Sequence, residues 1–263
     1  MVEKKIFETD EEMGRAAAAD AGEILREWTA EKKLRVIVSF AAAPSQDTFL
    51  AHLCKEEGID WGKVIATHLD EYLDLERGHP NTFEAYLQEH LFNNIAIPQE
   101  NIHYIKALGG SAQEIAARYG KFMEKTVEEV KKEGGIYIAC IGIGVNGHIA
   151  FNEPYAGKIT SGWVIPVRID EVSAKQQYDD YKGHPNPKAR YKNLKDVPRN
   201  AVTISSAGIL NADKIFCIVP GRQKAQAVKD MWDGPVTDEM PASLLKTHKC
   251  LTLYLDRNSA GML

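Results

Sequence analysis

The sequence has few cysteines and no metal-binding pattern. Its 263 residues include four cysteines that lie far apart and form no Cys-x-x-Cys pair, so a disulfide framework is not expected. Cys140 and Cys217 lie in apolar runs and are predicted to be buried, reduced thiols, which is typical of a cytoplasmic protein. The histidines show no H-E-x-x-H spacing, and we therefore predict no metal ion.

Long hydrophobic runs and an excess of positive charge are also missing. No apolar run approaches the ~18 residues needed to cross a bilayer, and Met1 to Met13 is charged where a signal peptide would be apolar. The formal net charge of -5 does not favour a nucleic-acid-binding surface. We expect a cytoplasmic protein that binds neither nucleic acid nor a membrane.

Five short apolar runs, rich in β-branched and aromatic residues, are typical of strands buried on both faces of a parallel sheet. They cover residues 34–40, 64–69, 136–143, 214–219 and 250–255. Helical patterns occupy residues 10–32, 45–57, 82–92, 111–132 and 221–231, with Ser45 and Ser111 as expected N-caps. This alternation predicts an α/β fold: a single doubly wound, mostly parallel sheet with helices on both faces, in one domain over residues 1–263.

One polar segment with several prolines, residues 178–199, interrupts this alternation. We interpret it as a long surface excursion that can serve as a lid. Ligands of open parallel sheets bind outside the carboxyl ends of the strands. The segments that directly follow the predicted strands are therefore the first place to look for a site.

Two adjacent carboxylates, Asp70 and Glu71, follow the second predicted strand. Neighbouring residues at a strand exit point in different directions, so one carboxylate can face a cleft while the other faces a helix cap or a cation. Glu71 is also a candidate substrate-binding residue. A cleft carboxylate whose pKa is raised by burial can remove a proton next to a carbonyl group. Taken alone, the pair is more typical of a helix cap or a solvated acidic surface.

A glycine-rich turn follows the third predicted strand, in IGIGVNGHIAFNEP. Gly144 and Gly147 allow the backbone to bend and to approach a ligand closely. His148 is suited to moving a hydroxyl proton, and the carboxylate of Glu153, five residues later, can orient its ring. The turn does not match G-x-G-x-x-G, so no dinucleotide site is predicted, and no Ser lies in a G-x-S-x-G elbow.

Two further turns suit an anion. Arg222 and Lys224 stand at a glycine turn that opens a predicted helix, where free backbone N–H groups and basic side chains favour a phosphate. The loop after the first predicted strand offers Ser45 at a second helix start, but it carries Ala42 and Ala43 rather than glycines.

Together these segments resemble the glucosamine-6-phosphate deaminase family. HLDEYLDL followed by HPNTF, and then GVNGHIAFNEP, resemble its two signature regions, and PGRQKA extends the resemblance. The family isomerises and deaminates an amino-sugar 6-phosphate to a ketose 6-phosphate and ammonia, without metal or redox cofactor. The resemblance implies that Asp70 is the base acting between C2 and C1. It also implies that His148 opens the sugar ring with Glu153 as its partner, and that Lys224 binds the phosphate.

This chain departs from the family pattern at three places. Asn146, a candidate catalytic residue, stands where the family has Asp, and the pair Ala42 and Ala43 replaces Thr-Gly. Gln176 stands near a usual basic residue of the family, for which Lys175 is a candidate substitute. The Asn-Gly-His triplet and PASLLKTH are similar to the galactosamine-6-phosphate branch. Both epimers therefore remain candidate substrates.

Two other functions stay open at this point. A 6-phosphogluconolactonase-like hydrolase would share the Gly-His turn, although the relatives with that activity continue differently after it. A non-catalytic sugar-phosphate sensor would account for Asn146 and the alanine loop. In each case the partner is a small sugar phosphate, no cofactor is expected, and a homo-oligomer is compatible with the resemblance.

Overall fold

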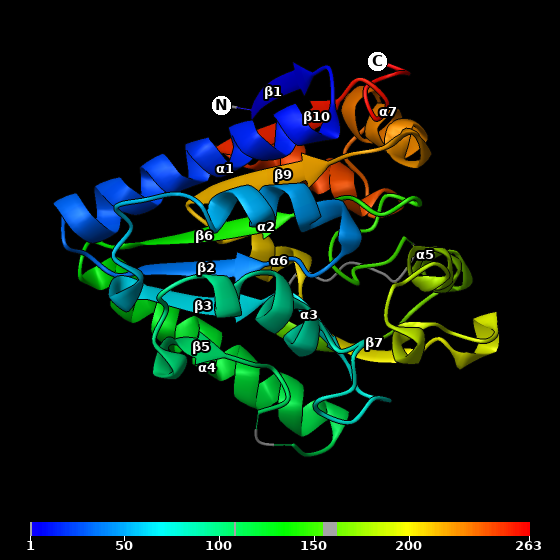
Figure 1. Cartoon of the computed structure of the whole chain (residues 1–263), viewed down its shortest axis with the longest axis horizontal. Coiled ribbons are helices and arrows are strands. Elements are labelled where there is room, and N and C mark those ends of the chain that lie inside the picture. Colours follow the sequence, from blue (N-terminus) through cyan, green and yellow to red (C-terminus); the bar gives the residue numbers. More distant parts are fainter. Residues whose placement is uncertain (1, 108, 155–161) are drawn as a thin grey trace.

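A seven-stranded sheet forms the centre of the computed structural model, which describes residues 2–107, 109–154 and 162–263 (Figure 1). All neighbouring strands of this sheet are parallel, in the order β1-β10-β9-β6-β2-β3-β5. The strands are β1 Val2–Phe7, β2 Val36–Phe40, β3 Val64–His68, β5 Ile102–His103, β6 Ile136–Ile141, β9 Lys214–Val219 and β10 Leu251–Asp256. The predicted doubly wound parallel sheet is confirmed.

The strand order reverses between β2 and β6. From β2 the chain moves outward through β3 to β5, and from β6 it moves outward in the opposite direction through β9 to β10. In such sheets a crevice opens at the carboxyl ends of the two strands where the direction changes. The loops after β2 and β6 are the alanine loop and the glycine-rich turn of the sequence.

Both faces of the central strands are buried, which explains their continuous apolar sequences. In β2, Val36, Val38 and Phe40 pack into one hydrophobic cluster, while Ile37 between them packs into the other. β6 alternates in the same way, with Ile138 in the first cluster. Alternate side chains of each strand therefore pack into the two hydrophobic clusters on opposite faces of the sheet.

Helices cover both faces, as predicted. α1 Asp10–Arg26, α2 Asp47–Leu53 and α3 Phe83–His90 contribute to the first cluster and lie in front of the sheet in Figure 1. α4 Ala112–Lys132, α6 Ser206–Leu210 and α7 Ala225–Asp233 contribute to the second. α5 Glu171–Tyr181 lies beyond the carboxyl ends of the strands (Figure 1).

A second, three-stranded sheet was not predicted. It is antiparallel, in the order β4-β8-β7, and comprises β4 Asp70–Tyr72, β8 Asn200–Ile204 and β7 Val164–Arg168. The expectation of a single sheet is therefore wrong in this part. The small sheet fixes the position of Asp70, which pairs with Thr203 directly after β3 leaves the large sheet.

One of the two expected helix caps is confirmed. Ser111 caps α4, and Glu114 completes a capping box with it. Ser45 does not cap a helix, because it lies inside a 3₁₀ turn that begins at Pro44 and makes no cap hydrogen bond. Proline fixes the backbone for the first helical position, which moves the cap to the residue before it.

The segment 178–199 is not simply a surface excursion. Its first residues belong to α5, and Tyr181, Ala189, Tyr191 and Val197 are buried in the first hydrophobic cluster. These side chains tie the segment to the protein body. Cys140 and Cys217 are buried, as expected. Within the described ranges, no helix has the length and apolar character that a transmembrane span requires.

Candidate active site

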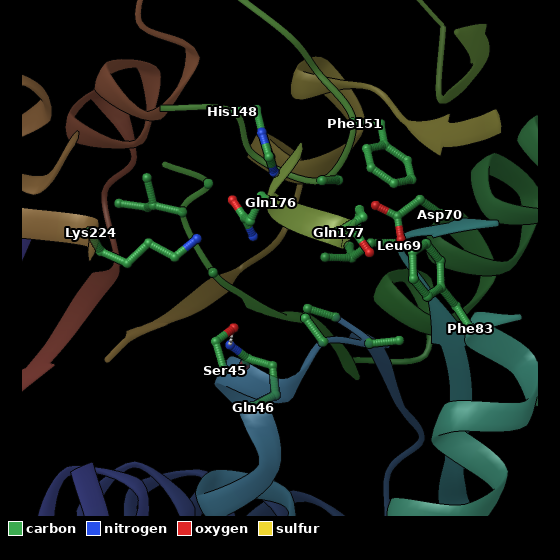
Figure 2. Close-up of a pocket in the computed structure, with 17 residues that line it drawn as sticks. Ser45, Gln46, Leu69, Asp70, Phe83, His148, Phe151, Gln176, Gln177 and Lys224 are labelled. Atoms are coloured by element: carbon green, nitrogen blue, oxygen red, sulfur yellow. Dashed lines mark hydrogen bonds between the residues drawn. The ribbon is translucent and has the colours of Figure 1, made fainter. Parts of the chain in front are cut away.

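A pocket opens at the carboxyl edge of the central sheet, where the segments that follow β2, β3, β6 and β9 meet α5 (Figure 2). It brings together residues that lie far apart in the sequence. The predicted site residues that line it are Ala42, Ala43, Ser45, Asp70, Gly144, His148 and Lys224. The crevice expected from the strand order is therefore the place where the candidate groups converge.

Asp70 presents a buried carboxylate to this pocket. It is 8% exposed and lies beside the rings of Phe83 and Phe151 (Figure 2). Burial, and secondly the neighbouring charge of Glu71, raise the pKa of the Asp70 carboxyl well above its ordinary value. A carboxylate tuned in this way is a stronger base than a solvated aspartate.

Glu71 faces the opposite way and does not line the pocket. Its carboxylate accepts hydrogen bonds from the backbone N–H groups of Tyr72 at 2.9 Å, Phe83 at 3.1 Å and Glu84 at 2.9 Å. Burial raises its pKa to about 7, although these three donors act in the other direction. Glu71 therefore stabilises the first turn of α3, where the sequence suggested a substrate ligand.

His148 lines the pocket with one edge of its ring (Figure 2). Its Nδ1 atom lies 2.7 Å from Oδ1 of Asn146, and no described residue makes a hydrogen bond to Nε2. Burial and then the charge of Lys224 lower its pKa to about 3, so the ring is neutral. A neutral ring whose Nδ1–H donates to Asn146 carries its lone pair on Nε2, where it can accept a proton from a ligand.

The two glycines of the turn have different roles. A Cβ atom on Gly144 would lie 2.1 to 2.3 Å from ring atoms of His148, so only glycine lets the ring approach the backbone. Gly147 does not line the pocket. It has a φ of 84° and packs against Met240, and its role is to shape the turn.

Glu153 was expected to orient His148 directly, and it does not. Its Oε2 atom is 3.6 Å from Nδ1 of His148 and makes no hydrogen bond to the ring. Ser173 of α5 lies between them, 2.8 Å from each of these two atoms. Burial raises the pKa of Glu153 to about 7. The direct partner of the ring is Asn146, and Glu153 lies behind it.

Lys224 provides the positive charge of the pocket. It ends the 3₁₀ turn after β9, is 4% exposed, and directs its ammonium group into the pocket (Figure 2). Burial lowers its pKa to about 8, against the opposing charge of Asp180. Among the described pocket-lining residues it is the only Lys or Arg. Arg222, at the start of the same turn, is exposed and does not line the pocket.

The alanine loop after β2 forms another wall of the pocket. Ser45 and Gln46 lie near the Lys224 side in Figure 2. The amide of Gln46 donates to the carbonyl of Ile218 at 3.2 Å and to Oγ of Ser45 at 3.3 Å. The loop is therefore tied to the end of β9, which places a hydroxyl group near the ammonium group.

Several lining residues were not found from the sequence. Gln177 reaches the pocket from α5 beside Gln176, which the sequence marked only as a departure from the family pattern, and Phe83 and Phe151 line its Asp70 side. Lys175 was expected to replace a basic residue at Gln176. It pairs instead with Asp179 on the exposed side of α5. Phe151 lies in the same motif as His148, and this closeness in the sequence could have indicated that it lines the pocket.

The chain is similar in sequence to several known proteins. A family model described as glucosamine-6-phosphate isomerases/6-phosphogluconolactonase matches residues 8–177. A glucosamine-6-phosphate deaminase of Thermoanaerobacter sp. (strain X514) is 30% identical over 96% of this chain and 92% of its own. A glucosamine-6-phosphate deaminase of Halothermothrix orenii is 31% identical over 81% of both chains.

Solved structures show the same fold. A monomeric glucosamine-6-phosphate deaminase superposes with a TM-score of 0.85 at 22% identity, over 99% of this chain and 100% of its own. The 6-phosphogluconolactonase of Trypanosoma brucei superposes with a TM-score of 0.73 at 16% identity, over 100% of this chain and 99% of its own.

Proposed function

The chain belongs to the family of glucosamine-6-phosphate isomerases and 6-phosphogluconolactonases, and we propose that it is an enzyme that converts an amino-sugar 6-phosphate to a ketose 6-phosphate and ammonia. One observation carries the proposal. A buried carboxylate, a neutral imidazole and a buried ammonium group, from three separate chain segments, line the same pocket. These groups match the needs of an isomerisation that consists of proton transfers on an anchored substrate.

The phosphate binds at the Lys224 side of the pocket. The buried ammonium group supplies the charge, and the Ser45 hydroxyl is available as a further donor. A phosphate held there directs the sugar toward His148 and Asp70, which lie across the pocket (Figure 2). The binding free energy of the phosphate thus positions the carbon atoms that react.

Ring opening is assigned to His148. Its Nε2 atom takes the proton of the C1 hydroxyl group and returns a proton to the ring oxygen, which leaves C1 as an aldehyde. Asn146 keeps the other ring proton on Nδ1 during this transfer. The low pKa of the imidazole keeps Nε2 free to accept a proton at neutral pH.

Asp70 then acts at the carbon atoms. The aldehyde acidifies the proton on C2, and the carboxylate removes it to form an enol with the amino group still on C2. Return of a proton to C1 produces an imine at C2. Water adds to this carbon and ammonia leaves, so the net reaction consumes one water. The apolar rings of Phe83 and Phe151 beside Asp70 favour its raised pKa.

Glucosamine 6-phosphate is the first candidate substrate, because the relatives at about 30% identity are named for it. Galactosamine 6-phosphate is the second, since the Asn146 and Pro241 to His248 sequences are similar to that branch. We further propose that residues 1–263 act as one catalytic unit in the cytoplasm, without a metal or redox cofactor.

The test is turnover by the purified protein. Each amino-sugar phosphate is incubated with the enzyme, and ammonia and ketose 6-phosphate are measured. Release of both products from at least one sugar is expected. Hydrolysis of 6-phosphogluconolactone with no ammonia from either sugar would instead identify a lactonase. Binding of the sugars without turnover would identify a sensor.

A further inference from the structure

Asn146 is held at both ends of its amide group. Its Oδ1 atom accepts from the backbone N–H of His148 at 3.1 Å and from Nδ1 of the same residue at 2.7 Å. Its Nδ2 atom donates to Oε2 of Glu153 at 3.1 Å and to Oδ2 of Asp170 at 3.0 Å. Both amide hydrogens therefore point to carboxylates.

These contacts leave one orientation for the amide. If the amide were flipped, its NH₂ group would face the backbone N–H of His148, and its oxygen would face two carboxylates. Because the amide oxygen then faces Nδ1, the imidazole must carry a hydrogen there. The tautomer that exposes the Nε2 lone pair to the pocket is thus fixed by groups that do not touch the substrate.

Asp170 is one of these groups, and nothing in the sequence pattern pointed to it. It is the N-cap of α5, where its Oδ1 atom accepts from the backbone N–H of Ser173 at 2.7 Å. Its second oxygen is thereby held toward Asn146. Ser173 itself is fully buried, and its hydroxyl donates to Glu153 while it lies next to the His148 ring.

We propose that Asp170 is a positioning residue for ring opening. This proposal rests on the proposed function. Its carboxylate orients Asn146, and Asn146 in turn holds His148 in the tautomer that serves as the base. In this pair Asn146 donates the hydrogen bond and Asp170 accepts it, so the negative charge lies on the residue further from the ring.

This division into donor and acceptor predicts that a carboxylate at position 146 is unfavourable. Asp at position 146 would place a carboxylate oxygen where Nδ2 now lies, 3.1 Å from Glu153 and 3.0 Å from Asp170. Three carboxylates would then share one site, which is unfavourable. With Asn at position 170, however, its NH₂ group can donate to Asp at position 146, while its oxygen still caps α5. Exchanging the two residues restores the pairing that either single change destroys.

Kinetics of four variants test the proposal: Asp170→Asn, Asp170→Ser, Asn146→Asp and the double variant N146D/D170N. Each single variant is expected to lower kcat by about tenfold or more, with KM changed by less than about threefold, because the base is misoriented while the phosphate site is intact. The double variant should recover at least about tenfold over Asn146→Asp.

Asp170→Ser separates positioning from folding. Serine is a good N-cap, so α5 keeps its cap and Tm should stay close to that of the wild type. The carboxylate that accepts from Asn146 is nevertheless lost. Wild-type kcat in Asp170→Ser, or single-variant losses that simply add in the double variant, would overturn the proposal.

A second measurement does not depend on turnover. The imidazole ¹⁵N shifts of His148, assigned by comparison with His148→Gln, report which ring nitrogen carries the proton. The Nδ1–H tautomer is expected in the wild type, and a mixture of tautomers in Asp170→Asn. Unchanged shifts would refute the role of Asp170 even if the enzyme is active. The expected shifts without turnover of either sugar would refute only the proposed function.

Discussion

Asp70 and Lys224 face the same pocket from opposite sides, with His148 between them (Figure 2). One is a buried carboxylate with a raised pKa, and the other is a buried ammonium group with a lowered pKa. We therefore assign proton transfer to the Asp70 side of the pocket and phosphate binding to the Lys224 side. Substitutions on the two sides should therefore have different kinetic effects.

Loss of the anchor should weaken binding more than chemistry. For Lys224→Ala, we expect KM to rise by about 10- to 100-fold, because a charge-assisted contact to phosphate is lost. Arg222→Ala is the matched control, since this exposed residue lies in the same turn but outside the pocket. Its KM should change by less than about twofold. Steady-state kinetics would contradict this account if the two variants behaved alike.

The pH profile of kcat/KM should be bell-shaped. Activity falls at low pH because protonation of Asp70, whose pKa is raised, removes the base. Activity falls again above about pH 8, where Lys224 loses its proton and its attraction for phosphate. His148, with a pKa of about 3, titrates below this range.

Lys224→Arg provides the control for the alkaline side of that profile. A guanidinium group stays protonated in proteins. The decline above about pH 8 should therefore disappear in this variant, whatever its absolute activity. A decline that persists unchanged would show that another group causes it.

Because Gly144 lies so close to the His148 ring, even the small substitution Gly144→Ala should lower kcat strongly. In Gly144→Ala the new methyl group would overlap the imidazole and displace it. We expect kcat to fall by about 100-fold, since a displacement of the base by about 1 Å has effects of that order. Tm and kcat are both measured. A normal kcat would show that the position of the imidazole is not critical, and a collapsed fold would appear as a large loss of Tm.

Glu71 should matter for stability and not for binding. In Glu71→Gln, an NH₂ group would replace one oxygen that now accepts from a backbone N–H of α3 or Tyr72. The free energy of unfolding should fall by about 1 to 2 kcal/mol at pH 5, below the pKa of about 7 at which Glu71 ionises, and KM should stay within about twofold of the wild type. A tenfold rise in KM at unchanged stability would instead make Glu71 a substrate ligand.

The pH dependence of stability offers a check on the same residue. Burial raises the folded-state pKa of Glu71 to about 7, from an ordinary value of 4.5. Its contribution to stability is therefore fully present below about pH 4.5 and is lost as the pH rises through 7. In Glu71→Gln this part of the pH dependence should be missing from the denaturation curves.

The central fold was predictable because five strands have both faces buried. β2 and β6 are continuous apolar runs for that reason. β1 escaped prediction because it is an edge strand, VEKKIF, which carries three charged residues and no continuous apolar run. β4, β7 and β8 form a small sheet, and β4 is only three residues long. Local sequence offers little signal for such strands, since their pairing depends on distant partners.

The site was predictable where function follows from the end of a strand. Asp70, His148 and Lys224 were found because each stands in a segment directly after a central strand. Asp170 and Ser173 were missed, because their contacts to Asn146 and His148 arise only when α5 packs over the turn. The spacing between His148 and Glu153 suggested a direct contact, but folding placed Ser173 between them.

The most direct test of the account is Asp70→Asn. The wild type and the variant are incubated with glucosamine 6-phosphate and galactosamine 6-phosphate, and ammonia, ketose 6-phosphate and sugar binding are measured. We expect the variant to bind the sugar phosphate as the wild type does. Its turnover should be about 100- to 10,000-fold lower, because the base at C2 is gone. Substantial ammonia release by Asp70→Asn would contradict the central role of this carboxylate.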